Sequence, residues 1–134
     1  MRLGFASPLL VAVHGTCLSP ADIDALAACG AAVVHCPESN LKLGSGVCPA
    51  ADLVGRGVRV AIGTDGAASN NDLNMWEEMD TAAKLHKLIS NDPKTLNAEQ
   101  AFEMATIRGA RALHLDKIIG SLELGKRADI VIVD

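Results

Sequence analysis

Residues 58–65 read VRVAIGTD, a short aliphatic run that ends in Gly-Thr-Asp, and two runs of the same kind precede it. The earlier runs are Leu9–Val13, which leads to His14, and Ala31–Val34, which leads to His35. Short apolar runs bounded by polar or glycine residues are typical of buried strands. The three runs therefore predict the strands around which the rest of the chain is arranged.

Helices are expected between and after these strands. Ser19–Asp22 places a serine at the N-cap and a proline in the first turn, and Gly30 supplies a C-terminal stop. A short helix is expected over Ala50–Arg56, and a partial apolar stripe predicts a long one over Leu73–Ile89. The stretch Pro37–Pro49 is expected to be a loop. Strands that alternate with helices are typical of parallel β-α units.

The last part of the chain combines a helix with a final strand. Asn97 and Gln100 have the spacing of a capping box for a helix that reaches about Leu113. The aliphatic run Ile130–Val133 predicts a strand with no element after it to pair with. The fold class is therefore α/β, in the order β-α-β-α-β-α-α-β, and we expect the chain to be part of a longer protein.

The composition is that of an ordinary globular protein, with 49% hydrophobic and 21% charged residues among 134. One Trp, two Phe and no Tyr leave a core of aliphatic residues, as in buried parallel strands. A net charge of −4 and the lack of a basic stripe argue against a nucleic-acid partner. No apolar run approaches a membrane span, and Met1–Val13 lacks a signal-peptide cleavage pattern, so no membrane association is expected.

The cysteines give no sign of a structural zinc site or of a disulfide framework. No two of them form a C-x-x-C pair, which is the spacing typical of zinc knuckles. They are Cys17, Cys29, Cys36 and Cys48. Reduced thiols are typical of the cytosol, so we expect a cytoplasmic protein.

A reactive side chain follows each predicted strand, namely His14, His35 and Asp65. The carboxyl ends of parallel strands meet at one edge of the sheet, so these side chains are expected to converge there. Histidine and aspartate are suited to metal ligation and proton transfer. Each residue alone also has a simpler interpretation, as a hydrogen-bonded structural histidine or a turn aspartate. Three such residues on consecutive strands favour a site.

Other polar residues have simpler interpretations. The stretch after His35 lacks the G-x-x-x-x-G-K-[ST] pattern, so a lining for a substrate is expected there and a phosphate-binding loop is not. The acidic residues Glu77, Glu78 and Asp80 are expected to form a solvated helix face. His86 and His114 lie in predicted helices, where surface or packing roles are expected.

Four segments carry a resemblance to a known family. They are His14-Gly-Thr, residues 34–46 (VHCPESNLKLGSG), residues 63–71 (GTDGAASNN) and the tail 119–131 (IGSLELGKRADIV). Together they resemble the amidohydrolase superfamily, in the branch that holds 5-methylthioadenosine/S-adenosylhomocysteine deaminases, chlorohydrolases and guanine deaminases. The SNLKLG and GTDG blocks are specific to this branch, and the tail block is general to the superfamily.

The resemblance implies a TIM-type (β/α)₈ barrel with a small added β-domain. Residues 1–117 would supply about strands six to eight of the barrel with their helices. Residues 118–134 would form the return strand toward the small domain. The chain is thus expected to be the C-terminal part of such an enzyme.

The resemblance also implies roles for individual residues. Asp65 matches a metal-ligating aspartate that also takes a proton from metal-bound water. His14 matches a histidine that positions and polarises that water, and His35, Ser39 and Asn40 are expected to bind the substrate. The implied cofactor is one divalent metal, Zn²⁺ or Fe²⁺, which would activate water for attack on a purine-type small molecule.

The chain departs from the family pattern in its ligand set. It has no His-x-His pair and lacks the further histidine ligand and the acidic glutamate, whereas a catalytic zinc normally has three protein ligands. We therefore expect this chain alone to be inactive. It is expected to associate with itself or with an N-terminal half-barrel, since open strand edges must be covered. The alternatives are a non-catalytic remnant or self-associating α/β fragment, and a chlorohydrolase or guanine deaminase of the same superfamily.

Overall fold

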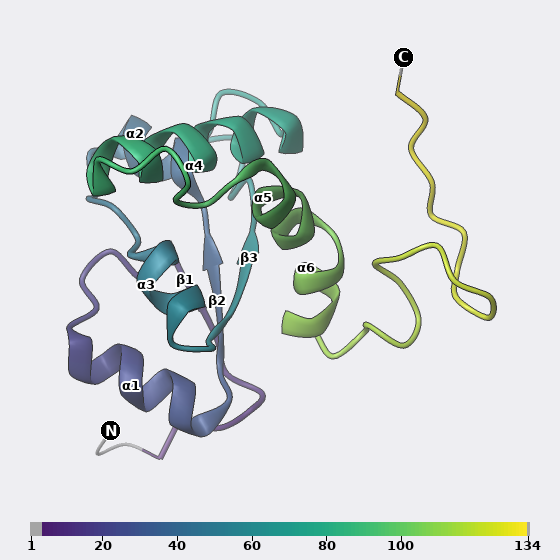
Figure 1. Ribbon diagram of the computed structural model, residues 1–134, viewed down its shortest axis with the longest axis horizontal. Coiled ribbons are helices and arrows are strands. Elements are labelled where there is room, and N and C mark those ends of the chain that lie inside the picture. The colour runs from purple at the N-terminus through teal and green to yellow at the C-terminus, as the bar shows by residue number, and fades with distance from the viewer. Residues whose placement is uncertain (1–3, 134) are drawn as a thin grey trace.

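A computed structural model describes residues 4–133 and contains a three-stranded sheet with helices packed around it (Figure 1). The strands are β1 (Val11–Val13), β2 (Ala32–His35) and β3 (Arg59–Ile62), and they lie in the order β1-β2-β3. Both pairings are parallel, with Val33 opposite Val60 in the second. The prediction of three parallel strands is confirmed, and β2 is the central one.

Within residues 4–133, six helices connect and follow the strands. They are α1 (Pro20–Cys29), α2 (Pro37–Leu43), α3 (Ala50–Gly55), α4 (Met75–Ser90), α5 (Ala98–Ala105) and α6 (Ile107–Ala112). In Figure 1, α2 and α4 lie together beyond the carboxyl end of the sheet, and the chain beyond α6 extends away from the body. None of these helices, within the described residues, has the length and apolar character needed to cross a membrane.

The two faces of the sheet are covered to different degrees. Val33, Val60 and Ile62 belong to the main core, which α1, α3, α4 and α5 complete. The opposite face carries Ala32 and Ala61, with Val11 and Val34 packed beside them and only Ala112 from the helices. On that face the cover is thin, and Val13 of β1 is 50% exposed.

The predicted helix starts are confirmed by their caps. Ser19 and Asp22 form a capping box at the start of α1, and Gly30 ends the helix with a φ of 68°. Asn97 and Gln100 form the second box, with each side chain accepting a hydrogen bond from the other residue's backbone N–H. These caps satisfy N–H groups that have no partner within the helix.

The expected loop Pro37–Pro49 is wrong over its first half, which forms α2. Pro37 occupies the first turn of the helix, where its missing N–H is no loss, and Glu38 lies at the positive end of the helix dipole. Gly44 ends the helix with a φ of 61°. The glycines of this stretch thus mark the end of a helix, and this places Ser39 and Asn40 on a rigid element.

The helix expected over 98–113 is divided in two at Thr106. The backbone of Thr106 leaves the helical region (φ −125°, ψ −102°), and its hydroxyl donates to the carbonyl oxygen of Phe102 at 2.7 Å. A threonine hydroxyl that bonds the preceding turn competes with the regular helix ladder.

The strand predicted at Ile130–Val133 is also wrong, because the described residues 130–133 are exposed and pair with no strand.

The amino ends of the strands are joined by one arginine. Arg59, the first residue of β3, donates hydrogen bonds to the carbonyl oxygens of Pro8 (2.8 Å), Arg111 (3.2 Å) and Gly30. The His114 ring is 2.9 Å from the same Pro8 oxygen. These contacts connect the segments before β1 and β2 with the end of α6, so they fasten this end of the sheet.

Candidate active site

The carboxyl ends of β1 and β3 bring His14 and Asp65 together. His14 Nε2 lies 3.6 Å from Asp65 Oδ2, and the two side chains are 38% and 30% exposed. Both residues have positive φ, 69° at His14 and 59° at Asp65. This left-handed conformation is uncommon in residues other than glycine, and such strain is concentrated at functional sites. The pair is therefore held, open to solvent, in a conformation that the surrounding structure imposes.

Two hydroxyl groups hold the Asp65 carboxylate. Ser39 Oγ, from α2, and Ser69 Oγ both donate to Asp65 Oδ2 at 2.8 Å. These bonds, Ser39 first, and one from the Gly66 backbone lower the pKa of Asp65 below its ordinary value. An ionised carboxylate at neutral pH is suited to bind a cation or to accept a proton.

Asn40 orients the His14 ring. Its Oδ1 atom lies 2.9 Å from His14 Nδ1, and the Asn40 side chain is almost fully buried. With this oxygen as the acceptor, Nδ1 of a neutral His14 carries the proton and Nε2 keeps its lone pair. Two acceptor atoms, Nε2 and Asp65 Oδ2, then face each other at 3.6 Å. Such a pair is stabilised by a proton, a water molecule or a cation between the two atoms.

His35 lies outside this group. The side chain is fully buried beneath α4, where its Nε2 is 3.3 Å from His86 Nε2 and the two rings meet edge to face. Burial, then the nearby His86 and His14, lowers the pKa of His35 to about 3. Of the surface and packing roles expected for His86, its burial agrees with packing. The structure thus brings His14, Ser39 and Asn40 to Asp65 but places His35 against the helix layer.

One acidic residue near the site, Glu78, is buried. Glu78 was expected on a solvated face of α4, and this is wrong, because the residue is fully buried. Its carboxylate accepts hydrogen bonds from Asn70 Nδ2 at 2.6 Å and from the Glu38 backbone N–H at 3.2 Å. Burial, the largest cause, raises the pKa of Glu78 to about 7. The spacing of Glu78, Ala82 and His86, all buried on one helix face, was the signal available in the sequence.

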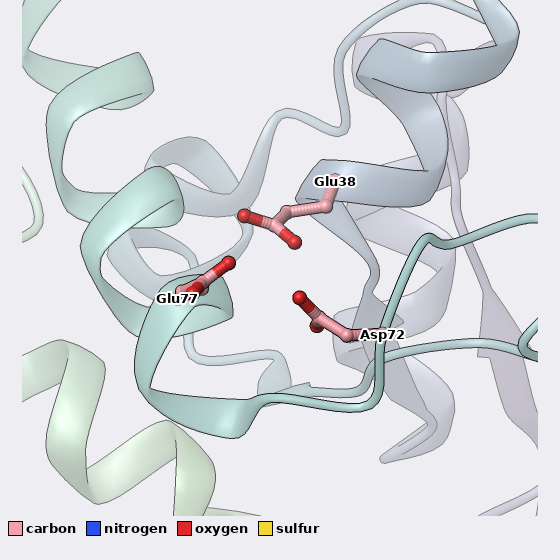
Figure 2. A group of neighbouring side chains, drawn as sticks. All are labelled: Glu38, Asp72 and Glu77. Carbon is pink, nitrogen blue, oxygen red and sulfur yellow. The ribbon is translucent and has the colours of Figure 1, made fainter.

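Three more acids converge at the surface nearby. Figure 2 shows Glu38, Asp72 and Glu77 pointing toward one another, with one carboxylate oxygen of each within 4.8 Å of the others. Thr81 donates to Glu38 at 2.9 Å and Asn74 donates to Glu77 at 3.0 Å. The group is largely exposed and shares no residue with the His14–Asp65 pair, so it is an acidic surface beside the site.

Comparison with known proteins identifies the family. The sequence profile described as "Amidohydrolase family" matches residues 1–134. The chain belongs to the amidohydrolase family. The 5-methylthioadenosine/S-adenosylhomocysteine deaminase of Teredinibacter turnerae is 52% identical over 132 residues, which are 98% of this chain and 30% of the relative. This amidohydrolase chain thus spans about 30% of the length of such curated relatives.

Solved structures of amidohydrolases match the fold as well. A zinc-bound adenosine deaminase from Xanthomonas campestris has a TM-score of 0.92 at 54% identity, over 96% of this chain and 29% of that one. E. coli guanine deaminase has a TM-score of 0.84 at 33% identity, over 93% of this chain and 28% of its own. The sheet and helices described above are therefore one segment of a larger amidohydrolase fold.

The residues of this amidohydrolase segment fit part of a zinc site. An ionised aspartate and an imidazole nitrogen lie side by side and partly open, and both are ligand types that zinc prefers. A catalytic zinc normally takes three protein ligands and keeps one position open. At this place the described residues 4–133 bring one carboxylate, that of Asp65, with the His14 imidazole beside it, which is fewer ligands than such a site needs.

Proposed function

We propose that this chain is the C-terminal part of a metal-dependent hydrolase that deaminates an adenosine-type purine nucleoside, such as methylthioadenosine or S-adenosylhomocysteine. One observation carries the proposal, namely the His14–Asp65 pair, which Ser39 and Asn40 hold at the carboxyl ends of the parallel strands β1 and β3. In this proposal residues 1–117 supply about strands six to eight of a (β/α)₈ barrel. Residues 118–134 lead to a small β-domain.

Within the reaction, Asp65 binds the metal and accepts a proton. Its carboxylate is ionised and held by Ser39 and Ser69 at Oδ2. A bound Zn²⁺ or Fe²⁺ lowers the pKa of a water molecule toward neutrality. His14 presents Nε2 toward the same place because Asn40 holds Nδ1. In this proposal Nε2 accepts a hydrogen bond from the attacking water and orients it, and Asp65 accepts the proton of that water.

The roles expected for three further residues are adjusted in this proposal. Ser39 and Asn40 were expected to bind the substrate, and we assign them first to holding Asp65 and His14, which they contact directly. His35 is assigned a supporting role beneath α4, since its side chain is fully buried. The substrate is a small molecule that approaches the exposed side of the His14–Asp65 pair.

The missing ligands are proposed to come from an N-terminal half-barrel. β1 and β3 are the edge strands of the sheet, and the face that carries Val11, Val13 and Val34 is only thinly covered. Strands of a preceding segment would pair with the edge of β1 and cover these residues. Self-association of this chain is the alternative occupant.

A segment exchange tests the proposed function. This chain replaces the matching segment of the Teredinibacter turnerae deaminase, and the purified hybrid is assayed with Zn²⁺ for ammonia release from methylthioadenosine. We expect activity in the hybrid and none in the 134-residue chain alone. An inactive but folded, metal-loaded hybrid would contradict the proposal and favour a non-catalytic remnant.

A second candidate function is supported by the likeness to E. coli guanine deaminase, at a TM-score of 0.84 and 33% identity. The same hybrid is therefore assayed with guanine and with a chlorotriazine. Turnover of either compound by the hybrid in preference to methylthioadenosine would assign that compound as the substrate class. The His14–Asp65 chemistry is common to all three reactions, so the result changes the substrate and leaves the site.

A further inference from the structure

We propose that Glu78 is a positioning residue that sets the distance between Ser39 and Asp65, by holding the two segments on which these residues lie. Glu78 is on α4, and its hydrogen bonds are to Asn70 and to the Glu38 backbone and not to Ser39 or Asp65. The part of this inference that concerns catalysis rests on the function proposed above. The structural part can be tested independently of it.

The first arm of the arrangement runs through Asn70. Asn70 Nδ2 donates to Glu78 Oε1 at 2.6 Å and to the carbonyl oxygen of Thr64 at 3.0 Å. Thr64 precedes Asp65, whose backbone is in the strained left-handed region with a φ of 59°. Asn70 is itself buried, with 2% exposure. A single amide group therefore ties the peptide before Asp65 to the Glu78 carboxylate.

The second arm runs through the start of α2. The Glu38 backbone N–H donates to Glu78 Oε2 at 3.2 Å, and this N–H belongs to the first turn of the helix, where it has no partner within the helix. The next residue, Ser39, donates its hydroxyl to Asp65 Oδ2 at 2.8 Å. One carboxylate thus holds the backbone on both sides of the Ser39–Asp65 hydrogen bond.

A role in apolar packing does not explain why a charged residue, Glu78, is buried. The side chain is fully buried, and no ion pair in the described part of the chain includes it. A buried carboxylate without a cation is unfavourable unless hydrogen bonds compensate for lost water. Both of its oxygens accept a hydrogen bond, and both donors belong to segments next to Asp65. The acid therefore fixes these segments, where a methionine or leucine would only fill the space.

The test compares amide hydrogen exchange by NMR in the 134-residue chain and its variants. Glu78→Ala removes both acceptors, and Glu78→Gln keeps the shape and one acceptor. In Glu78→Ala, we expect amide exchange at Glu38 and at residues 64–70 to accelerate about tenfold more than exchange in β2 does. In Glu78→Gln the same amides should accelerate less. Glu77→Gln is the matched control, an exposed neighbour on the same helix, and should leave these amides unchanged.

A second variant tests the two arms separately, and it still tests the positioning role of Glu78 if Glu78→Ala does not fold. Asn70→Ser removes the amide that donates to Glu78 and Thr64 but leaves the Glu38 N–H bonded to Glu78. Exchange should increase at residues 64–70 and stay unchanged at Glu38. Acceleration spread equally over all slow amides in these variants would overturn the proposal, because it would show only a general loss of stability.

The catalytic part is tested in the hybrid deaminase. Glu78→Gln should lower kcat by about 10- to 100-fold with KM changed less than threefold, since the reacting groups lose their alignment and not their substrate contacts. Unchanged kcat in Glu78→Gln would overturn the positioning role in catalysis. If the wild-type hybrid is itself inactive, the proposed function fails while the exchange result still decides whether Glu78 holds the two segments.

Discussion

The two ends of the sheet use polar side chains in opposite ways. At the amino end, the Arg59 guanidinium donates hydrogen bonds to backbone carbonyl oxygens, so its N–H groups stabilise the fold itself. At the carboxyl end, side chains hold other side chains: Asn40 holds His14, and Ser39 holds Asp65. That arrangement leaves His14 Nε2 and the Asp65 carboxylate open to a ligand.

Left-handed backbone occurs at both ends of the sheet. It is found at His14 and Asp65 at the carboxyl end, and at His114, which contacts Pro8 at the amino end. Strain that persists in a fold must be stabilised by its surroundings, and here Glu78 and Asn70 supply that support for the peptide before Asp65. Under the proposed function, the amino end of the sheet serves stability and the carboxyl end serves activity, so mutations should separate the two.

The largest effect is expected from Asp65→Asn in the hybrid deaminase. The amide cannot act as an anionic ligand or accept the proton, so kcat/KM should fall by about 1,000-fold or more. Asparagine tolerates the left-handed conformation and keeps one oxygen that can accept from Ser39 and Ser69, so the urea midpoint of the 134-residue chain should fall only slightly. Activity within tenfold of wild type would remove Asp65 from the mechanism and break the comparison.

Arg59→Met should lower stability and leave activity nearly unchanged, which is the reverse of the effect expected for Asp65→Asn. The variant leaves three carbonyl oxygens without their charged donor, and we expect the free energy of unfolding in urea to fall by about 2–3 kcal/mol. In the hybrid, kcat should stay within about threefold. Lys84→Met, which breaks an exposed ion pair with Asp80, is the control and should cost about 0.5 kcal/mol or less. A loss at Arg59 no larger than this control would contradict the fastening role.

Asn40→Leu should reduce activity to a smaller degree than Asp65→Asn. The leucine fills a similar volume but leaves His14 Nδ1 without its acceptor, so the ring loses its fixed tautomer. We expect kcat in the hybrid to fall about 10- to 100-fold and its pH profile to change shape. An unchanged pH profile with reduced kcat would mean that Asn40 supports the site by packing alone.

The smallest effect is expected in the pH dependence of stability. The folded-state pKa of Glu78, about 7, lies above the ordinary 4.5, so its contribution to stability falls as pH rises through this range. His35 acts oppositely: its pKa is lowered from 6.5 to about 3, so its contribution is lost as pH falls below 6.5.

Urea unfolding between pH 4.5 and 7 separates these two contributions. Glu78→Gln should make stability rise more steeply with pH, by up to about one proton equivalent, because the His35 contribution is then unopposed. Glu77→Gln should leave the curve unchanged. Identical slopes in wild type and Glu78→Gln would mean that Glu78 binds no proton in this range.

Much of the carboxyl end could be predicted from the sequence. The three strands are short aliphatic runs, and parallel strands present the residues after them at one edge of the sheet, where His14 and Asp65 meet. The resemblance directed attention to Ser39 and Asn40, which contact this pair. Their presence on a helix was missed, because Gly44 was interpreted as part of a loop when it is the helix end.

The remainder depends on contacts that no local pattern contains. Arg59 bonds carbonyl groups that are far from it in the sequence, and any arginine at a strand start has the same local pattern. Glu78 was assigned to solvent by its charge, although its spacing from Ala82 and His86 places it on the buried face of α4. His35 points toward α4 because strand residues alternate between faces, so a strand-end position alone does not direct a side chain to the site.

The thin cover on one face of the sheet has a consequence for how such enzymes can be recombined. That face is lined by Val11, Ala32, Val34 and Ala61, which are small or β-branched and carry no polar atoms. A junction of this kind is specified by volume and not by particular hydrogen bonds, and cores tolerate exchanges that conserve volume. We expect crossover points placed before Leu9 to join this segment to segments of other amidohydrolases with little loss of folding, so that it can be exchanged as one unit.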